Sequence, residues 1–168
     1  MTPSIAASNQ NPPAKFAEHL RAAIIQFLGP ICSATFVACN GHAAEDPVDP
    51  VISVISLVGD VKWVFSLVLT KATAEFITEK FSGFKIAYDH PDMKDMVGEI
   101  SNIIAGDVVA RLDRVGIKVQ LSLPTVLRGK SLKLVNPENL ASAVMRFQSS
   151  QGEFLVQLSW TKESSHEK

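Results

Sequence analysis

The chain has 168 residues, of which 46% are hydrophobic and 20% are charged, and its formal net charge is −1. This composition is typical of a folded globule, and the length fits one domain that buries a core of its own. A net charge near zero without a basic block argues against nucleic acid or an anionic membrane as the main partner. Two cysteines, Cys32 and Cys39, are too few for a disulfide framework, so we expect core thiols in a reducing compartment.

The N-terminal part of the chain admits two interpretations. Residues 1–13 contain several Asn and Pro residues and predict a flexible arm. Residues 14–28 have apolar residues at helical spacing and precede a Gly-Pro pair, which predicts an amphipathic helix that ends there, followed by a strand over 33–39. Residues 22–39 also loosely resemble a signal-peptide core, but the long polar stretch before them and the internal proline favour the helix. No apolar run reaches the roughly 18–20 residues that span a bilayer, so we expect a cytoplasmic protein without a membrane segment.

The middle of the chain predicts a hairpin and two helices. Residues 51–58 and 61–69 are β-branched runs on either side of Gly59-Asp60, a pair typical of a two-residue hairpin turn. Residues 70–83 begin with a threonine cap candidate and end with glycine, which predicts a helix. A further helix is expected over 91–115, because Asp and Pro precede its apolar repeat and Gly116 follows it. In the second β-branched run the side chains expected on one buried face are Val61, Trp63, Phe65, Leu67 and Leu69.

The C-terminal third predicts mainly strands. The expected strands are 117–123, 125–135 with a turn at Gly129, and a final hairpin of 141–148 and 153–160. Because adjacent hairpins imply antiparallel pairing, the fold class is α+β, with long helices on a mainly antiparallel sheet. We expect one domain over 14–161 and a solvated tail over 162–168.

The helix predicted over 91–115 contains residues that disfavour helix formation. Gly98 and Gly106 each cost about 1 kcal/mol relative to alanine, and Asn102 costs less. At 100° per residue, Asp95, Glu99, Asn102 and Gly106 fall within an arc of about 60°, and Gly98 flanks it. Either this face is kept clear so that another surface can approach Glu99 and Asn102, or the glycines permit tight helix packing. The side chains expected on the opposite, buried face are Met93, Met96, Val97, Ile100, Ile103, Ile104 and Val108.

The pattern Asp95-x3-Glu99-x2-Asn102, followed by Pro124 in Ser-Leu-Pro-Thr, resembles the signature of the CheC/CheX/FliY chemotaxis phosphatases, and most closely the CheX branch. The resemblance extends over about residues 14–160 and implies a CheC-like fold. Members of this family remove the phosphoryl group from an aspartyl phosphate on a response-regulator receiver such as CheY.

The resemblance implies roles for individual residues. Asn102 would position the attacking water and Glu99 would dock a receiver lysine, while Gly98 and Gly106 would let the receiver come close. Asp95 would support either the start of the helix or the docking surface. No cofactor is implied on this chain, because Mg²⁺ arrives with the phosphorylated receiver, and pairing of CheX-like sheets implies a homodimer.

The motif occurs once in this sequence. The first predicted helix offers Glu18-x-x-Arg21, which lacks an amide, so a second site is not expected. The main alternative to a phosphatase is a non-enzymatic module that binds a receiver or another signalling protein through the same helix face. A structural subunit of a motor switch complex is a third interpretation, for which we would expect additional binding segments.

Other candidate residues favour structural roles. The segment with Cys39, His42, Asp46 and Asp49 matches no zinc pattern, so we expect a solvated loop and no metal site. His90 is expected to form part of a helix entry. Ser122 lacks the context of a nucleophile elbow.

Overall fold

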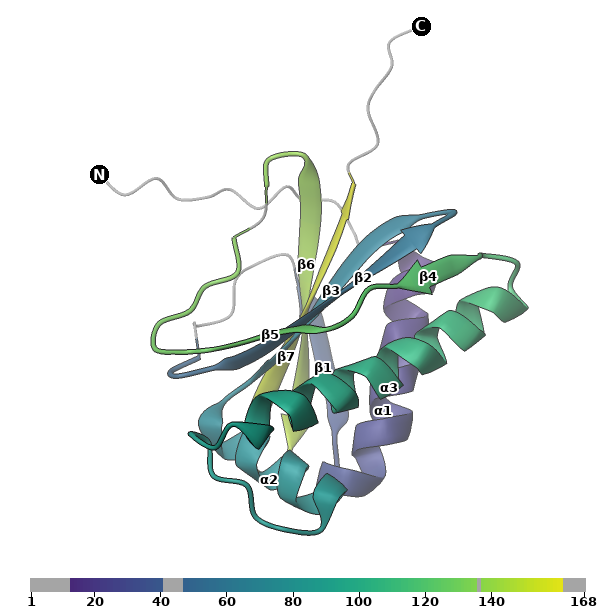
Figure 1. The fold of residues 1–168 in the computed structure, drawn as a ribbon. Coiled ribbons are helices and arrows are strands. Elements are labelled where there is room, and N and C mark those ends of the chain that lie inside the picture. Colours follow the sequence, from purple (N-terminus) through teal and green to yellow (C-terminus); the bar gives the residue numbers. More distant parts are fainter. Residues whose placement is uncertain (1–12, 41–46, 136, 162–168) are drawn as a thin grey trace, which may run out of the picture.

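The computed structural model describes residues 13–40, 47–135 and 137–161, and Figure 1 shows their arrangement. Within these ranges, three α-helices pack against one another on one face of a seven-stranded sheet. The helices are α1 (Ala14–Cys32), α2 (Lys71–Ser82) and α3 (Asp92–Arg114). The strands are β1 (Thr35–Asn40), β2 (Val51–Gly59), β3 (Lys62–Leu69), β4 (Val119–Leu121), β5 (Thr125–Arg128), β6 (Leu140–Ser149) and β7 (Gly152–Thr161).

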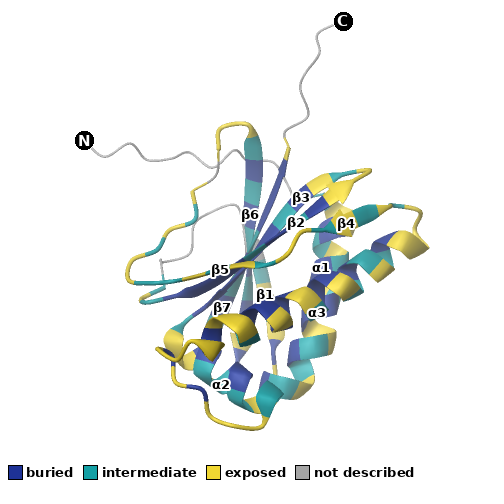
Figure 2. Ribbon diagram, in the orientation of Figure 1, coloured by how far each residue is buried: buried dark blue, intermediate teal, exposed yellow. Residues whose placement is uncertain are grey.

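The sheet confirms the predicted α+β class. Its strand order is β1-β6-β7-β3-β2-β4, with β5 also paired to β2, and every pairing is antiparallel. Figure 2 shows that buried residues dominate the strands where the helices cover them. On the central strand β3 the predicted face is buried at Trp63, Phe65 and Leu67, which lie opposite Trp160, Leu158 and Val156 of β7. Val61, just before β3, is only partly buried, and the other face of the strand is also buried at Ser66 and Val68, so both faces of its second half are covered.

The hairpin predictions are confirmed, whereas two other strand predictions need correction. β2 and β3 pair as far as Val58 and Lys62, so the turn between them contains Gly59, Asp60 and Val61 instead of the two residues expected, and β6 and β7 form the final hairpin. The strand expected over 117–123 is shortened to β4. The strand expected over 125–135 ends at Arg128, because Ser131 adopts a left-handed conformation with φ of 54° that interrupts an extended chain.

The predicted end of α1 is also wrong. The helix runs on to Cys32 with Pro30 inside its last turn, although proline removes one backbone hydrogen bond. Leu28 and Cys32 lie one turn apart and are both buried, so core packing offsets the lost bond. The helix ends at Ser33, which has a left-handed φ of 55° and donates its backbone N–H to the carbonyl of Gly29 at 2.8 Å.

Cys32 is a core thiol, as predicted. Burial raises the pKa of this thiol, so it resists ionisation. The side chain of Cys39, together with His42 and Asp46, lies outside the described residues, as do the tail and nearly all of the predicted arm. Within the described ranges, no three His, Cys, Asp or Glu side chains gather closely enough to hold a metal ion. No helix there combines the length and apolar character needed to cross a membrane.

The predicted caps of α2 are present. Thr70 accepts a hydrogen bond from the backbone N–H of Thr73 at 3.3 Å, and Gly83 closes the helix with φ of 82°. We expect Thr70→Ala to lower the free energy of unfolding by about 0.5–2 kcal/mol, because one N-terminal N–H loses its acceptor. Urea denaturation measures this change. Thr70→Ser keeps a hydroxyl acceptor and serves as the control, so equal loss in both variants would contradict a capping role.

Candidate active site on helix α3

The start of α3 is formed by the turn before it. Nδ1 of His90 accepts the backbone N–H of Asp92 at 3.2 Å, and the His90 carbonyl accepts the N–H of Met93 at 3.2 Å. The negative charges of Asp92 and Asp95 in the first turn stabilise the helix, because they lie at the positive end of its dipole. His90 is therefore part of a helix entry, as predicted, and the observed bounds of α3 lie within one residue of the predicted ones.

The segment before α3 is also tied to the sheet. Nη1 of Arg128, the last residue of β5, donates to the backbone carbonyls of Tyr88 and His90, the latter at 3.0 Å. The backbone N–H of Tyr88 donates to Oε1 of Glu75 on α2 at 2.9 Å. These bonds hold the N-terminal end of α3 against both the sheet edge and α2. Sequence reasoning did not single out Arg128, because its carbonyl partners are brought to it by the fold.

The far end of α3 is linked to α1. Nε of Arg111 donates to Oδ2 of Asp107 at 2.8 Å, one helical turn away, and its Nη2 donates to the side-chain oxygen of Gln26 on α1. The helix is therefore anchored on both sides of its central turns, where the motif residues lie.

The two faces predicted for α3 are observed. Asp95, Glu99, Asn102 and Gly106 are all exposed. Within the described part of the chain, the side chains of Asp95, Glu99 and Asn102 have no hydrogen-bond or ion-pair partner. An added Cβ at Gly106 would meet nothing within 4 Å, so this position faces open space. On the opposite face Met93, Val97, Ile100, Ile104 and Val108 are fully buried, while Met96 and Ile103 are partly buried.

Gly98 does not lie on the open face, and this corrects the expectation that it borders a receiver. It is buried, and an added Cβ would lie 3.4 Å from Cγ2 of Val126 and 3.6 Å from Cγ of Pro124. The glycine therefore lets the backbone of α3 approach the chain between β4 and β5. Gly98 therefore serves packing, against β5 and the residue before it instead of against another helix, and Gly106 lies at an open position.

Pro124 is thereby brought next to the motif helix. Two residues earlier, Ser122 is tied to β2: its N–H donates to the carbonyl of Ser56 at 2.9 Å, and its Oγ accepts the N–H of Ser56 at 3.0 Å. Ser122 thus has a structural role and no nucleophilic context, as expected. The connection that carries Pro124 is held between β2 and α3.

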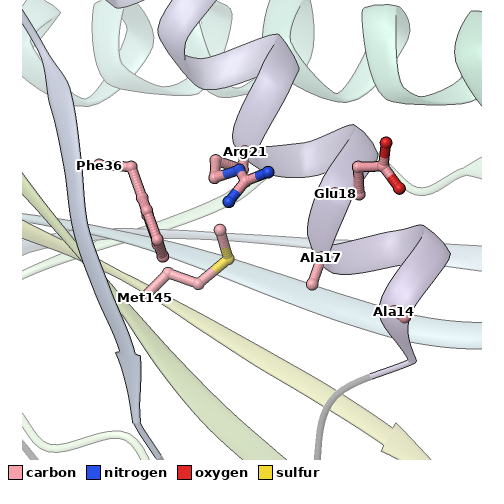
Figure 3. Close-up of a pocket in the computed structure, with 6 residues that line it drawn as sticks. All are labelled: Ala14, Ala17, Glu18, Arg21, Phe36 and Met145. Atoms are coloured by element: carbon pink, nitrogen blue, oxygen red, sulfur yellow. The ribbon is translucent and has the colours of Figure 1, made fainter.

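The pair on α1 is arranged differently, as Figure 3 shows. The guanidinium of Arg21 lies 5.1 Å from the centroid of the Phe36 ring, and Glu18 points away from it. These residues line a pocket of about 210 Å³ together with Ala14, Ala17 and Met145. An arginine packed on an aromatic ring offers no amide to a substrate.

The exposed carboxylate of Glu99 and carboxamide of Asn102 define the chemistry available at this face of α3. A carboxylate accepts hydrogen bonds and attracts a cation, and a carboxamide both donates and accepts without carrying a charge. Among the described residues nothing encloses either side chain, so both are open to a group presented by another surface. The arrangement suits completion of an active site carried by a partner macromolecule.

Solved structures of other proteins share this fold. CheX from Vibrio vulnificus has a similar fold, with a TM-score of 0.76 and 22% identity over 86% of this chain and 97% of that one. A CheC-like superfamily protein from Shewanella has a TM-score of 0.74 and 19% identity over 90% and 100% of the two chains. A chain in the CheX–CheY–BeF3–Mg complex from Borrelia burgdorferi has a TM-score of 0.69 and 19% identity, over 89% and 97%.

No curated protein has a significantly similar sequence. The family model described as chemotaxis phosphatase CheX matches residues 51–148, which extend from β2 into β6 and include all of α3 and Pro124. The chain therefore belongs to the chemotaxis phosphatase CheX family.

Proposed function

We propose that this protein hydrolyses the aspartyl phosphate of a CheY-like receiver domain. The observation that carries the proposal is that Glu99 and Asn102 are exposed, without partners among the described residues, on one face of an anchored helix in a CheX-family chain. The similarly folded chain from Borrelia, which occurs in a complex with CheY, supports a receiver as the partner.

Asn102 positions the attacking water in this proposal. An acyl phosphate is already activated, so most of the barrier is lowered by placing water in line with the leaving oxygen. The amide of Asn102 orients the water by accepting and donating hydrogen bonds, and it carries no charge that would repel phosphate. The water oxygen bonds to phosphorus as the bond to the aspartyl oxygen breaks, which releases inorganic phosphate and a free carboxylate.

Glu99 docks the receiver and contributes no metal site. Its carboxylate would repel the phosphoryl group but would pair well with a receiver lysine, through a charge-assisted hydrogen bond. Charge neutralisation at the phosphoryl group comes from the receiver and its Mg²⁺, so this chain needs no cofactor of its own. Asp95 lies one turn before Glu99 and can extend the same acidic surface or support the helix start.

The test is the decay of phosphorylated receivers with and without this protein. Each receiver-domain regulator of the same organism is phosphorylated and mixed with a substoichiometric amount of the protein. We expect faster decay with multiple turnovers for at least one regulator. Binding without faster decay would instead support a non-enzymatic receiver-binding module, and neither binding nor decay with any regulator would overturn both functions.

We expect Glu99→Ala to weaken binding of the receiver by about tenfold or more, because a hydrogen bond to a charged group contributes about 1.5–3 kcal/mol. Titration of a phosphorylated or beryllofluoride-activated receiver measures the affinity. Glu18→Gln removes an exposed carboxylate from α1 and is the control, with no expected change. Unchanged affinity in Glu99→Ala would exclude a docking role for this carboxylate.

A cytoplasmic homodimer is a further part of the proposal. β1 lies at one edge of the sheet, with β4 and β5 beyond β2 at the other, and strand edges can pair between copies. Light scattering of the purified protein measures the oligomeric state directly, and a monomer at all concentrations tested would contradict this expectation.

A further inference from the structure

Leu123 is the most exposed of the large apolar residues that the structure describes. Its exposed fraction is 88%, and it lies in the connection between β4 and β5, which runs alongside α3 in Figure 1. It is also close to the motif in space. The next residue, Pro124, would contact a side chain at position 98, and Gly98 directly precedes Glu99. Leu123 and Glu99 are thus each one residue away from the same tight contact.

The backbone at Leu123 is held on both sides. Before it, Ser122 donates its backbone N–H to the carbonyl of Ser56 of β2 and accepts the N–H of Ser56 on its Oγ, which also donates to the carbonyl of Leu123 at 3.0 Å. After it, Pro124 packs over Gly98. The connection therefore presents the leucine side chain to solvent in a fixed place instead of folding it into the core.

A fixed, exposed leucine beside a polar site is well suited to docking. Burying its side chain against a partner removes apolar surface from water, and little conformational entropy is lost because the backbone is already ordered. Apolar anchors next to charged contacts are typical of residues that dominate binding. Asp95, Glu99 and Asn102 offer no apolar contact, so the open face of α3 alone lacks such an anchor.

We propose that Leu123 is a docking and specificity residue, which inserts into an apolar depression on the receiver beside the phosphorylated aspartate. This inference rests on the proposed function and names a feature that the substrate receiver must carry. A receiver with a charged or polar side chain at the matching place is rejected, because burying that group against leucine leaves it without a hydrogen-bond partner.

The experiment compares three variants with the wild type. Leu123→Asn is close in shape but polar, and Leu123→Met remains apolar. Val135→Asn also replaces a highly exposed apolar residue with asparagine, on the segment between β5 and β6. Steady-state hydrolysis of the preferred phosphorylated receiver gives kcat and KM. Titration with the beryllofluoride-activated receiver gives affinity, and thermal melting reports on the fold.

We expect Leu123→Asn to raise KM and the dissociation constant about tenfold with kcat nearly unchanged, while Leu123→Met and Val135→Asn behave as the wild type. Melting temperatures should agree, because both positions are exposed. Unchanged KM and affinity in Leu123→Asn, or a fall in kcat alone, would overturn the docking role while wild-type activity preserved the proposed function. If the wild type bound a receiver without hydrolysing it, the phosphatase proposal would fail and the titrations would still test Leu123.

Discussion

Asn102→Ala should lower the rate of receiver dephosphorylation by about 100-fold or more and leave the melting curve unchanged. The expected loss is large because misplacement of a reacting group by about 1 Å can cost this much, and the alanine variant retains nothing to orient the water. The fold should survive because Asn102 is exposed and has no partner within the described residues. Single-turnover decay of the phosphorylated receiver measures the effect without interference from product release.

The matched control is Gln120→Ala, which removes an exposed carboxamide from β4. It should leave both activity and stability close to the wild type. Receiver affinity should also be nearly unchanged in Asn102→Ala, which separates this variant from Glu99→Ala. Wild-type activity in Asn102→Ala, with a comparable melting curve, would disprove the water-positioning role.

The same substitution at the two glycines of α3 should have opposite effects on stability. Gly98→Leu should lower the free energy of unfolding by about 1–3 kcal/mol, because the atoms beyond Cβ would enter space held by Val126 and Pro124. Gly106→Leu should be neutral or stabilising by up to about 1 kcal/mol, because leucine favours the helix and nothing lies within 4 Å of the added Cβ. Chemical denaturation of both variants measures these changes.

Activity should separate from stability at position 106. Side chains on a helix lean toward its N-terminus, so a leucine there covers the position of Asn102 one turn earlier. We expect Gly106→Leu to lower receiver dephosphorylation at least tenfold in a fully folded protein, whereas Gly106→Ala should retain most activity. Loss of stability in step with loss of activity in Gly106→Leu would show that this position serves packing instead of access.

Local sequence determined the elements whose signals are contained within a few residues. The threonine and glycine at the ends of α2 and His90 before α3 each satisfy backbone groups within a few residues, so their effect does not depend on distant contacts. The same holds for the two faces of α3, because helical spacing alone places Glu99 and Asn102 together.

Tertiary structure decided the features that depend on distant residues. Core burial of Leu28 and Cys32 carries α1 past the Gly-Pro pair, where local preference predicted its end. Gly98 and Gly106 are the same residue type on the same helix, yet their surroundings differ. Pro124 and Val126 cover Gly98, whereas Gly106 remains open. The sequence predicts Leu123 as part of a strand over 117–123. In the fold, the hydrogen bonds between Ser122 and β2 and the contact of Pro124 with α3 leave its side chain exposed to solvent. Spacing along one element specifies which residues share a face, but the partner that covers each part of that face comes from elsewhere in the chain, and only the assembled fold specifies it.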